Sequence, residues 1–330
     1  MKNRSYQALV VEEVKKNRFI RTIRNMSIND LPEGDLLIRV KYSSLNYKDA
    51  LSASGNRGVT RQYPHTPGID AAGVIEKSSN DQFKAGDEVI VTSYDLGMNT
   101  SGGFGQFIRV PAGWAVKLPE GLTLEQSMIF GTAGFTAGMS IYNLLETITP
   151  EHGKIVVTGA TGGVGIIAAG ILCHLGFEVD AVSGKSDTSF LKNLGVKKII
   201  DRNNFIKDMS KPLLKPQWAG AVDTVGGDIL ATAIKSVTQN GVVTCCGNVA
   251  SADIPVTVYP FILRGISLLG IDSQNCPMDL RCKVWDKLAL EWKIDILEEI
   301  FTQIHLNDLN DQIDNILKGK LKGRTVVNLD

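Results

Sequence analysis

One glycine-rich stretch constrains the fold of this chain more than any other feature of the sequence. The apolar run 154–158 leads directly into Gly159-Ala160-Thr161-Gly162-Gly163-Val164-Gly165, and an apolar helical pattern follows at 164–175. Glycines permit a tight turn and a close backbone approach to a pyrophosphate, and a helix N-terminus attracts negative charge. A strand before the turn, a helix after it and a second strand at 178–182 predict a dinucleotide site. A turn packed for purely structural reasons is the alternative.

Beyond about Thr123 the chain alternates between apolar strand-like runs and helical patterns, which is typical of βαβ units on a parallel sheet. Strands are expected at 154–158, 178–182, 196–200, 220–225, 242–246 and 266–271. Gly176, Gly195 and Gly241 are placed to end the helices that precede them. Six strands of this kind make one doubly wound nucleotide-binding domain of the Rossmann type.

The 330 residues of the chain suit two domains. Residues 1–126 contain short strand patterns separated by Pro and Gly, which predicts a barrel-like, β-rich domain. The Rossmann domain is expected over 127–294. Residues 295–330 hold a helical stretch and a last strand, are too short to fold alone, and are expected to return to the first domain. The predicted fold class is therefore α/β, with a β-rich domain and a doubly wound parallel sheet.

Charge and cysteine content exclude several classes of partner. Lys+Arg and Asp+Glu number 35 each, so the formal net charge is zero and nothing draws the chain to nucleic acid or an anionic membrane. No apolar run is long enough to span a bilayer, and the polar start lacks a signal-peptide core. Five cysteines without a CxxC pair indicate reduced thiols, so we expect a cytoplasmic protein. No GxSxG or HExxH motif supports a hydrolase.

The end of the second predicted strand distinguishes NAD from NADPH. An NAD site usually has a carboxylate there, about 20 residues beyond the glycines. This strand ends in Ser183-Gly184-Lys185, and Asp180 lies in mid-strand. A hydroxyl, an open backbone and a cation suit a 2′-phosphate, and a charge-assisted hydrogen bond of about 1.5–3 kcal/mol changes affinity about 10- to 150-fold. NADPH is the predicted cofactor, with a solvated Lys185 as the alternative.

The ordered motifs of the chain resemble the zinc-free quinone oxidoreductase branch of the medium-chain dehydrogenase/reductase superfamily. Within that branch the resemblance is to the YhdH/YhfP-type proteins, which include acrylyl-CoA reductases. The matching motifs are Ser43-Ser44-Leu45-Asn46-Tyr47-Lys48-Asp49, Pro67-Gly68-Ile69-Asp70, Gly131-Thr132-Ala133-Gly134-Phe135-Thr136-Ala137, the glycine-rich turn, Ser183-Gly184-Lys185 and Pro260-Phe261-Ile262-Leu263-Arg264-Gly265. The resemblance implies a GroES-like catalytic domain beside the Rossmann domain.

The resemblance also implies an enzyme without zinc. The superfamily's zinc alcohol dehydrogenases have a Cys ligand in place of Asn46 and a Gly-His-Glu motif in place of Gly68-Ile69-Asp70. No metal is therefore expected. Without a Lewis acid an alkoxide loses its usual stabilisation, whereas hydride addition to a conjugated acceptor leaves a delocalised enolate that a few donors stabilise. The predicted function is NADPH-dependent reduction of a quinone, with acrylyl-CoA or another α,β-unsaturated carbonyl as the alternative, and a non-catalytic NADPH-binding protein as the second alternative.

Asn46 and Tyr47 are the predicted catalytic residues, because the resemblance places them nearest the nicotinamide. Asn46 could donate to the substrate carbonyl, and Tyr47 could donate a proton or wall the pocket. The alternative for Asn46-x-x-Asp49 is a helix N-cap with an acidic partner. Asp70 is interpreted as a structural remnant of the lost zinc motif.

Cofactor contacts are expected at the carboxyl ends of the parallel strands, where ligands bind in open α/β sheets. Arg202 could stack on adenine or be a solvated charge, and Arg264 and Arg324 could touch an anion or hold the domains together. A homodimer through the edge strand at 266–271 is implied by the resemblance. The full set of predicted cofactor-binding residues is Thr132, Thr136, Thr158, Gly159, Ala160, Thr161, Gly162, Gly163, Val164, Gly165, Ser183, Gly184, Lys185, Arg202, Asp223, Thr224, Gly247, Asn248, Ile271, Ser273 and Arg324.

Overall fold

The computed structural model describes residues 4–295 and 297–330, which form two compact units. Unit 1 takes the described residues of Met1–Thr132, Gln274–Ala289 and Leu297–Asp330, and unit 2 takes those of Ala133–Ser273 and Leu290–Ile296. The predicted division had placed 127–294 in one domain, whereas the structure groups Gln274–Ala289 with unit 1.

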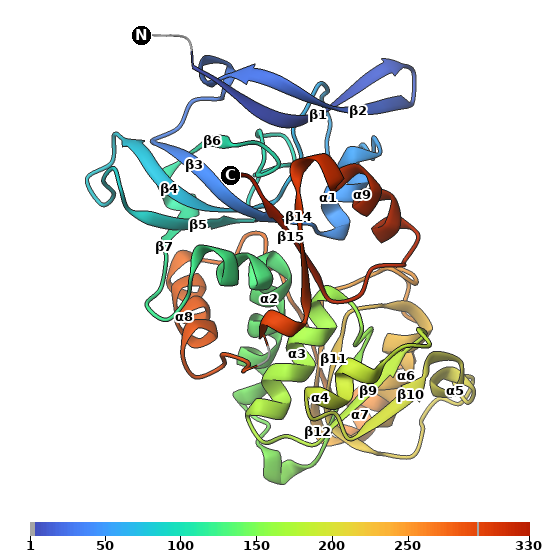
Figure 1. Ribbon diagram of the computed structural model, residues 1–330. Coiled ribbons are helices and arrows are strands. Elements are labelled where there is room, and N and C mark those ends of the chain that lie inside the picture. The colour runs from blue at the N-terminus through green and yellow to red at the C-terminus, as the bar shows by residue number, and fades with distance from the viewer. Residues whose placement is uncertain (1–3, 296) are drawn as a thin grey trace. The chain divides into compact units, whose positions relative to one another are not determined.

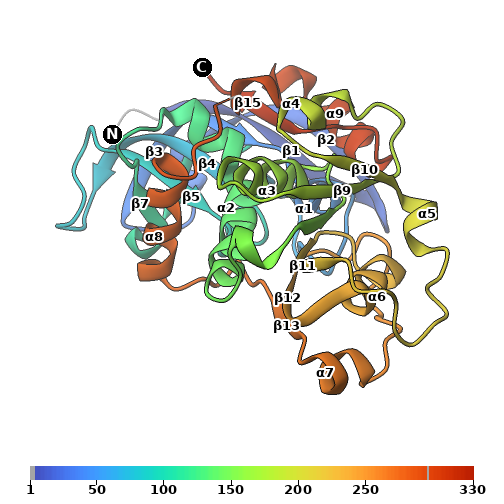
Figure 2. The same cartoon turned by 90° about the horizontal axis from the view of Figure 1, so that it is seen from below.

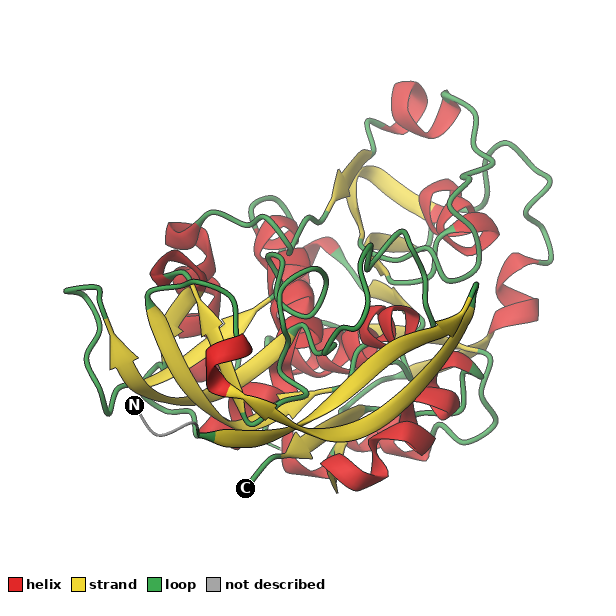
Figure 3. Ribbon diagram, turned by 90° about the horizontal axis from the view of Figure 1, so that it is seen from above, coloured by secondary structure: helices red, strands yellow, loops and turns green. Residues whose placement is uncertain are grey.

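The strands of unit 1 form a β-hairpin and a seven-stranded sheet. Figure 3 colours all strands of the protein yellow. In the hairpin, β1 (Ser5–Lys15) pairs antiparallel with β2 (Arg18–Ser27). The sheet has the order β14-β15-β3-β4-β5-β7, and β6 pairs with β3. Its strands are β3 (Leu36–Ser44), β4 (Asp70–Ser78), β5 (Glu88–Thr92), β6 (Phe107–Val110), β7 (Ala115–Lys117), β14 (Phe301–His305) and β15 (Arg324–Asn328).

The C-terminal segment returns to this sheet, because β15 pairs antiparallel with β3. Apolar side chains from both ends of the chain meet in one core, which includes Leu9, Ile38, Phe104, Ile313 and Val327. The helices of unit 1 are α1 (Tyr47–Ala53), α8 (Met278–Ala289), α9 (Leu309–Leu317) and the 3₁₀ turns η1 (Ile28–Asp30), η2 (Ala112–Trp114), η4 (Leu297–Glu299) and η5 (Leu306–Asp308). Helix α2 (Leu124–Leu145) begins in unit 1 and ends in unit 2.

Unit 2 contains a six-stranded parallel sheet of order β10-β9-β8-β11-β12-β13 (Figure 1). In chain order this is 3-2-1-4-5-6, the doubly wound order of nucleotide-binding domains. All six predicted strands are present. Strands β11, β12 and β13, labelled in Figure 2, are neighbours in the sheet. Their bounds are β8 (Ile155–Thr158), β9 (Val179–Ser183), β10 (Lys198–Asp201), β11 (Trp218–Asp223), β12 (Val237–Cys245) and β13 (Ser267–Gly270).

The helices of unit 2 connect these strands and cover the sheet. They are α3 (Gly163–His174), α4 (Ser189–Asn193), α5 (Arg202–Ile206), α6 (Gly227–Ser236), α7 (Tyr259–Arg264) and the 3₁₀ turn η3 (Pro150–His152). Arg264 donates to the carbonyl oxygens of Leu214, Lys235 and Val237, so it holds backbone segments of unit 2 together. No helix within residues 4–295 and 297–330 is long and apolar enough to cross a membrane.

The prediction that Gly241 ends a helix is wrong. Helix α6 stops at Ser236, and β12 already begins at Val237. Within β12, Asn240 has φ 57 and turns the backbone. A Cβ at Gly241 would lie 2.1 Å from the Val237 side chain and 2.5 Å from the Ala219 carbonyl oxygen. A glycine that permits close backbone packing and a glycine that ends a helix look alike in the sequence.

Candidate functional site

The glycine-rich turn joins β8 to α3, between the strand and the helix that the sequence predicts. Gly159 has φ 59, and a Cβ there would lie 2.3 Å from the Thr224 hydroxyl. A Cβ at Gly165 would lie 2.4 Å from the Gly159 carbonyl oxygen, so no side chain fits at either position. Gly162 precedes α3, whose first N–H groups have no acceptor within the helix. The turn therefore fits a pyrophosphate, with its glycines close to the ligand and the helix N–H groups as donors.

A buried hydrogen-bond network beneath the turn ties β8 to β11. The Thr158 hydroxyl donates to Asp223 Oδ1 at 2.6 Å, and Asp223 Oδ2 accepts from the N–H groups of Val225 and Gly226. The Thr224 hydroxyl donates to the Thr158 carbonyl oxygen at 2.9 Å. Burial raises the pKa of Asp223, and these hydrogen bonds act in the opposite direction. The network holds the turn at the point where the strand order reverses, which is where doubly wound sheets bind their ligands.

The end of β9 carries a cluster that the sequence revealed only in part. Ser183 Oγ lies 3.1 Å from Thr161 Oγ1 and accepts from the Lys185 N–H. A Cβ at Gly184 would lie 3.0 Å from the guanidinium carbon of Arg202, so this arginine lies against the Gly184 backbone. The Arg202 guanidinium and an open backbone thus meet at one corner of unit 2, at the strand end that carries the Ser183 hydroxyl and Lys185. Their chemistry fits a 2′-phosphate.

Asp180, the carboxylate of β9 itself, is used elsewhere. It is buried in β9 and accepts from the Trp218 indole N–H at 2.8 Å, and Lys154 Nζ lies 3.2 Å away. Its side chain therefore belongs to the interior of unit 2, consistent with its predicted mid-strand position.

The remaining predicted residues of unit 2 lie at the carboxyl ends of the strands or beside them. The Thr136 hydroxyl donates to Ser273 Oγ at 2.8 Å. A Cβ at Gly247 would lie 2.0 Å from the Thr224 carbonyl oxygen, so the segment containing Gly247 and Asn248 packs tightly beside β11. The Ile271 N–H donates to the Cys245 carbonyl oxygen.

In unit 1 a buried polar cluster centres on the carboxylate of Asp70. It accepts from Ser44 Oγ at 2.6 Å, from Asn46 Nδ2 at 2.7 Å and from Thr132 Oγ1 at 2.6 Å. The Thr132 backbone N–H also donates to it, at 2.9 and 3.0 Å to the two oxygens. Asp70 is fully buried. The Asp70 carboxylate thus has a structural part, because it accepts donors from residues 44–46 and from Thr132.

Arg324 lies in the same cluster rather than at an open surface. Its Nε donates to the Ile129 carbonyl oxygen, Nη1 to the Leu45 carbonyl oxygen and Asn46 Oδ1, and Nη2 to Ser44 Oγ. Nη2 is 3.8 Å from Asp70 Oδ2, and only 3% of the residue is exposed. Burial lowers the pKa of Arg324, and the two nearby aspartates oppose this shift. Every guanidinium nitrogen of Arg324 thus donates within unit 1, and its cofactor contact stays a prediction.

Asn46 caps helix α1, as the alternative interpretation of the sequence proposed. Its backbone N–H donates to Asp49 Oδ2 at 2.8 Å, and Asp49 Oδ1 accepts from the Ile69 N–H. The Asn46 side chain is held at both ends, donating to Asp70 and accepting from Arg324. Its amide is thus oriented within the cluster.

Tyr47 and Asp49, which follow Asn46 in helix α1, differ in their exposure to solvent. Tyr47 is 40% exposed. Asp49 is fully buried, and burial, helped by the nearby Asp70 carboxylate, raises its pKa to about 7.

Ser44, Ser93 and Gly131 also belong to this cluster and were not predicted as site residues. Gly131 has φ 50 and ψ −156, which interrupts α2, and a Cβ there would lie 2.5 Å from both Asp70 Oδ2 and Ser44 Oγ. Ser93, at φ 64, places its hydroxyl 2.9 Å from that of Thr132. A glycine inside an otherwise apolar helical pattern was the available signal for Gly131.

The Asp70 carboxylate accepts several hydrogen bonds and lies near the Arg324 guanidinium. This environment suits a buried anion and not a metal ligand. By the resemblance to zinc alcohol dehydrogenases, Asn46 and Ile69 take the places of a Cys and a His ligand. Within the described part of the chain, no group of three or more His, Cys, Asp or Glu side chains could hold a metal ion.

Comparison with known proteins places this geometry in a family. Residues 32–120 match the alcohol dehydrogenase GroES-like domain, and residues 163–289 match the zinc-binding dehydrogenase family. The chain is 41% identical over 98% of its length to acrylyl-CoA reductase AcuI of Ruegeria pomeroyi, covering 99% of that protein. It is also 41% identical to YhfP of Bacillus subtilis, over 98% of this chain and 99% of the relative. YhfP is named as a quinone oxidoreductase on a provisional basis.

Solved structures agree with these relatives. The yhdH oxidoreductase from Salmonella enterica in complex with NADP has a TM-score of 0.95 at 40% identity, covering 98% of this chain and 100% of that one. Bacillus subtilis yhfP with NAD bound has a TM-score of 0.96 at 41% identity, covering 99% and 100%. The chain is therefore an oxidoreductase of the medium-chain dehydrogenase/reductase superfamily. Within it, the chain belongs to the quinone oxidoreductase branch that contains YhfP, YhdH and AcuI.

Proposed function

We propose that this oxidoreductase uses NADPH to reduce a conjugated carbonyl compound, without a metal ion. The corner formed by Ser183, Gly184, Lys185 and Arg202 carries the choice of NADPH, because the end of β9 holds Ser183 rather than a carboxylate and the Arg202 guanidinium lies against Gly184. The Asp201 carboxylate, opposite Ser183, accepts the N–H groups of Asn203 and Asn204 at the start of α5. The NADP complex of the 40% identical yhdH oxidoreductase supports the same choice.

NADPH, when bound, supplies a hydride to the acceptor. The glycine-rich turn binds the pyrophosphate, and Lys185 with Arg202 binds the 2′-phosphate. Asp70 and Arg324 hold the Asn46 amide in one orientation and so fix the start of helix α1. Tyr47, a partly exposed residue at the start of helix α1, donates the proton that completes reduction.

Two acceptor classes follow from this chemistry. A quinone takes up the hydride and a proton to give a hydroquinone. An enoyl thioester takes hydride at its β-carbon and a proton at its α-carbon. The 41% identity to an acrylyl-CoA reductase over nearly the full length of both chains favours the thioester as the second candidate beside the quinone.

A parallel assay of NADPH oxidation separates these candidates. Acrylyl-CoA, crotonyl-CoA, benzoquinone and phenanthrenequinone are compared by kcat/KM, before and after exhaustive chelation. Higher efficiency on one class identifies the acceptor, and full activity after chelation supports metal-free chemistry. Loss of activity restored by zinc would contradict it, and silence on all four acceptors would favour a non-catalytic NADPH-binding protein.

The chain is further proposed to act as a cytoplasmic homodimer. None of the five cysteines, all of which lie in the described part of the chain, forms a disulfide, which suits a reducing compartment. Strand β13 is the last strand of the unit 2 sheet and leaves one edge open to pairing. The segment just before it exposes large apolar side chains, namely Val258, Tyr259, Ile262 and Leu263. Such a patch beside an open edge favours a second copy of the chain as its partner.

A further inference from the structure

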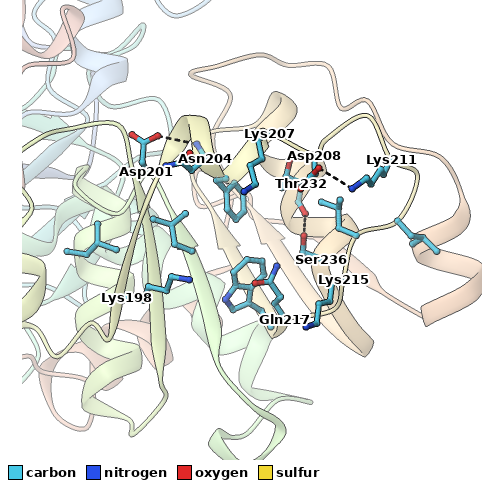
Figure 4. Close-up of a pocket in the computed structure, with 16 residues that line it drawn as sticks. Lys198, Asp201, Asn204, Lys207, Asp208, Lys211, Lys215, Gln217, Thr232 and Ser236 are labelled. Atoms are coloured by element: carbon cyan, nitrogen blue, oxygen red, sulfur yellow. Dashed lines mark hydrogen bonds and ion pairs between the residues drawn. The ribbon is translucent and has the colours of Figure 1, made fainter.

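A cavity of about 530 Å³ lies in unit 2 between β10, α5 and α6 (Figure 4). This volume is within the range of about 300–1,000 Å³ typical of small-molecule sites. The remaining walls come from the segment 207–217 and the start of β11. Among the described residues that line it, none belongs to the glycine-rich turn, to Ser183–Lys185 or to Asp223 and Thr224. Arg202 does not line it either, although it follows the lining residue Asp201, so the cavity shares no lining residue with the proposed dinucleotide site.

The lining of this cavity carries an excess of positive charge. Its charged residues are Lys198, Lys207, Lys211, Lys215, Asp201 and Asp208. Lys211 pairs with Asp208 at 3.1 Å, and the Asp201 carboxylate accepts the N–H groups of Asn203 and Asn204 at the start of α5. The other three lysines form no ion pair with any residue in the described part of the chain. In a protein of zero formal net charge, this is a local concentration of cations.

The base of the cavity is apolar and aromatic. Phe205 and Trp218 form a tilted pair with ring centroids 5.7 Å apart, and Ile200 and Leu214 lie beside them in the lining. The Trp218 indole N–H already donates to Asp180, so the part of this ring left for a ligand is hydrocarbon. Amide groups of Asn204 and Gln217 add hydrogen-bonding capacity at the wall.

We propose that this lysine-rimmed cavity binds a nucleoside monophosphate, in addition to the dinucleotide bound at the glycine-rich turn. Lys198, Lys207 and Lys215 provide point charges for the phosphate, a role in which lysine is common. The apolar base accommodates the nucleobase, and the amides face the ribose hydroxyls. Figure 4 shows these lysines arranged around the cavity.

Calorimetric titration of AMP into protein saturated with NADPH tests this proposal, because NADPH keeps AMP out of the dinucleotide site. We expect one AMP bound per chain. Combined substitution Lys198→Gln, Lys207→Gln and Lys215→Gln should weaken AMP at least about tenfold, since each lost charge-assisted contact is worth about that much. Lys192→Gln, an exposed lysine of α4 outside the cavity, is the matched control and should leave AMP affinity unchanged.

A second titrant tests the nucleobase part. Ribose 5-phosphate carries the same phosphate without the ring, and should bind at least about tenfold more weakly than AMP. All three lysines are exposed, so the triple variant should retain its fold and its NADPH affinity, which the same titrations measure. Absence of AMP binding to the NADPH-saturated protein overturns the proposal. So does AMP binding that the triple substitution leaves intact, or equal affinity for ribose 5-phosphate.

Discussion

The guanidinium of Arg202 lies against the backbone of Gly184, 3.0 Å from the point that a Cβ would occupy. The two residues are brought together because β10 pairs with β9 in parallel, with Asp201 opposite Ser183. This pairing turns a short Ser-Gly-Lys segment into a corner with two cations.

The first prediction concerns selectivity for the 2′-phosphate at this corner. Lys185→Ala and Arg202→Ala should each weaken NADPH about 10- to 150-fold, because each removes a charge-assisted contact. NADH, which lacks the phosphate, should change little. Fluorescence titration of both cofactors measures the ratio, and Lys192→Ala serves as control. Equal losses for NADPH and NADH would refute the assignment.

The second prediction concerns the buried pair of Asp70 and Arg324. Asp70→Asn removes the charge that faces a buried guanidinium, which should lower the free energy of unfolding by about 3–5 kcal/mol. Arg324→Met in the Asp70→Asn background should recover part of that loss, because no unpaired charge then remains. Urea unfolding of the single and double variants measures the coupling; strictly additive losses would show that the two side chains act independently.

The third prediction is a pH dependence that originates at Asp49. Its folded-state pKa of about 7 lies above the unfolded value of about 3.9, so the folded protein binds more protons between these values. The contribution of Asp49 to stability is therefore present below about pH 4 and is lost as the pH rises towards 7. Asp49→Asn should flatten this decline in unfolding free energy, measured by denaturant titration across that range. An unchanged slope would mean that Asp49 is ionised in the folded protein. Asp311→Asn, on the exposed side of α9, is the control.

The fourth prediction tests the break in helix α2. Gly131→Ala should destabilise the protein by about 2–6 kcal/mol, because it adds left-handed strain to a clash with Asp70 and Ser44. Gly113→Ala is the matched control, since no atom lies within 4 Å of its Cβ position and its φ is not left-handed. Thermal unfolding of both variants measures the difference. Similar melting temperatures for the two would argue against the tight packing at Gly131.

The fifth prediction concerns the proposed homodimer. Ile262→Asp and Leu263→Asp place charges on side chains that are 68% and 58% exposed, so the fold of the chain should tolerate them. If a second copy covers this patch, the double variant should sediment as a monomer while the unmodified protein sediments as a dimer. Leu290 is 65% exposed and lies outside the patch, so Leu290→Asp should leave the dimer intact. A monomeric unmodified protein would eliminate the dimer proposal.

The sequence by itself determined the features that depend on neighbouring residues. The six strands of unit 2 and the turn from Gly159 to Gly165 were predicted because apolar periodicity and glycine spacing are local signals. The Asn46–Asp49 cap was anticipated for the same reason, as both partners lie within one helical turn. Gly241 shows the limit of such signals, because its purpose depends on the packing of Val237 and Ala219.

Only the tertiary structure decided which distant side chains share a site. Arg324 reaches Ser44 across 280 positions of the chain, and Asp70 meets Thr132 across 62. Arg202 joins Gly184 only because β9 and β10 are neighbours in the sheet. A residue pattern records the chemistry of each side chain, but a hydrogen bond requires its partner within about 3 Å. That proximity is set by strand order and packing, which is why the sequence could not place Arg324 in the buried cluster around Asp70.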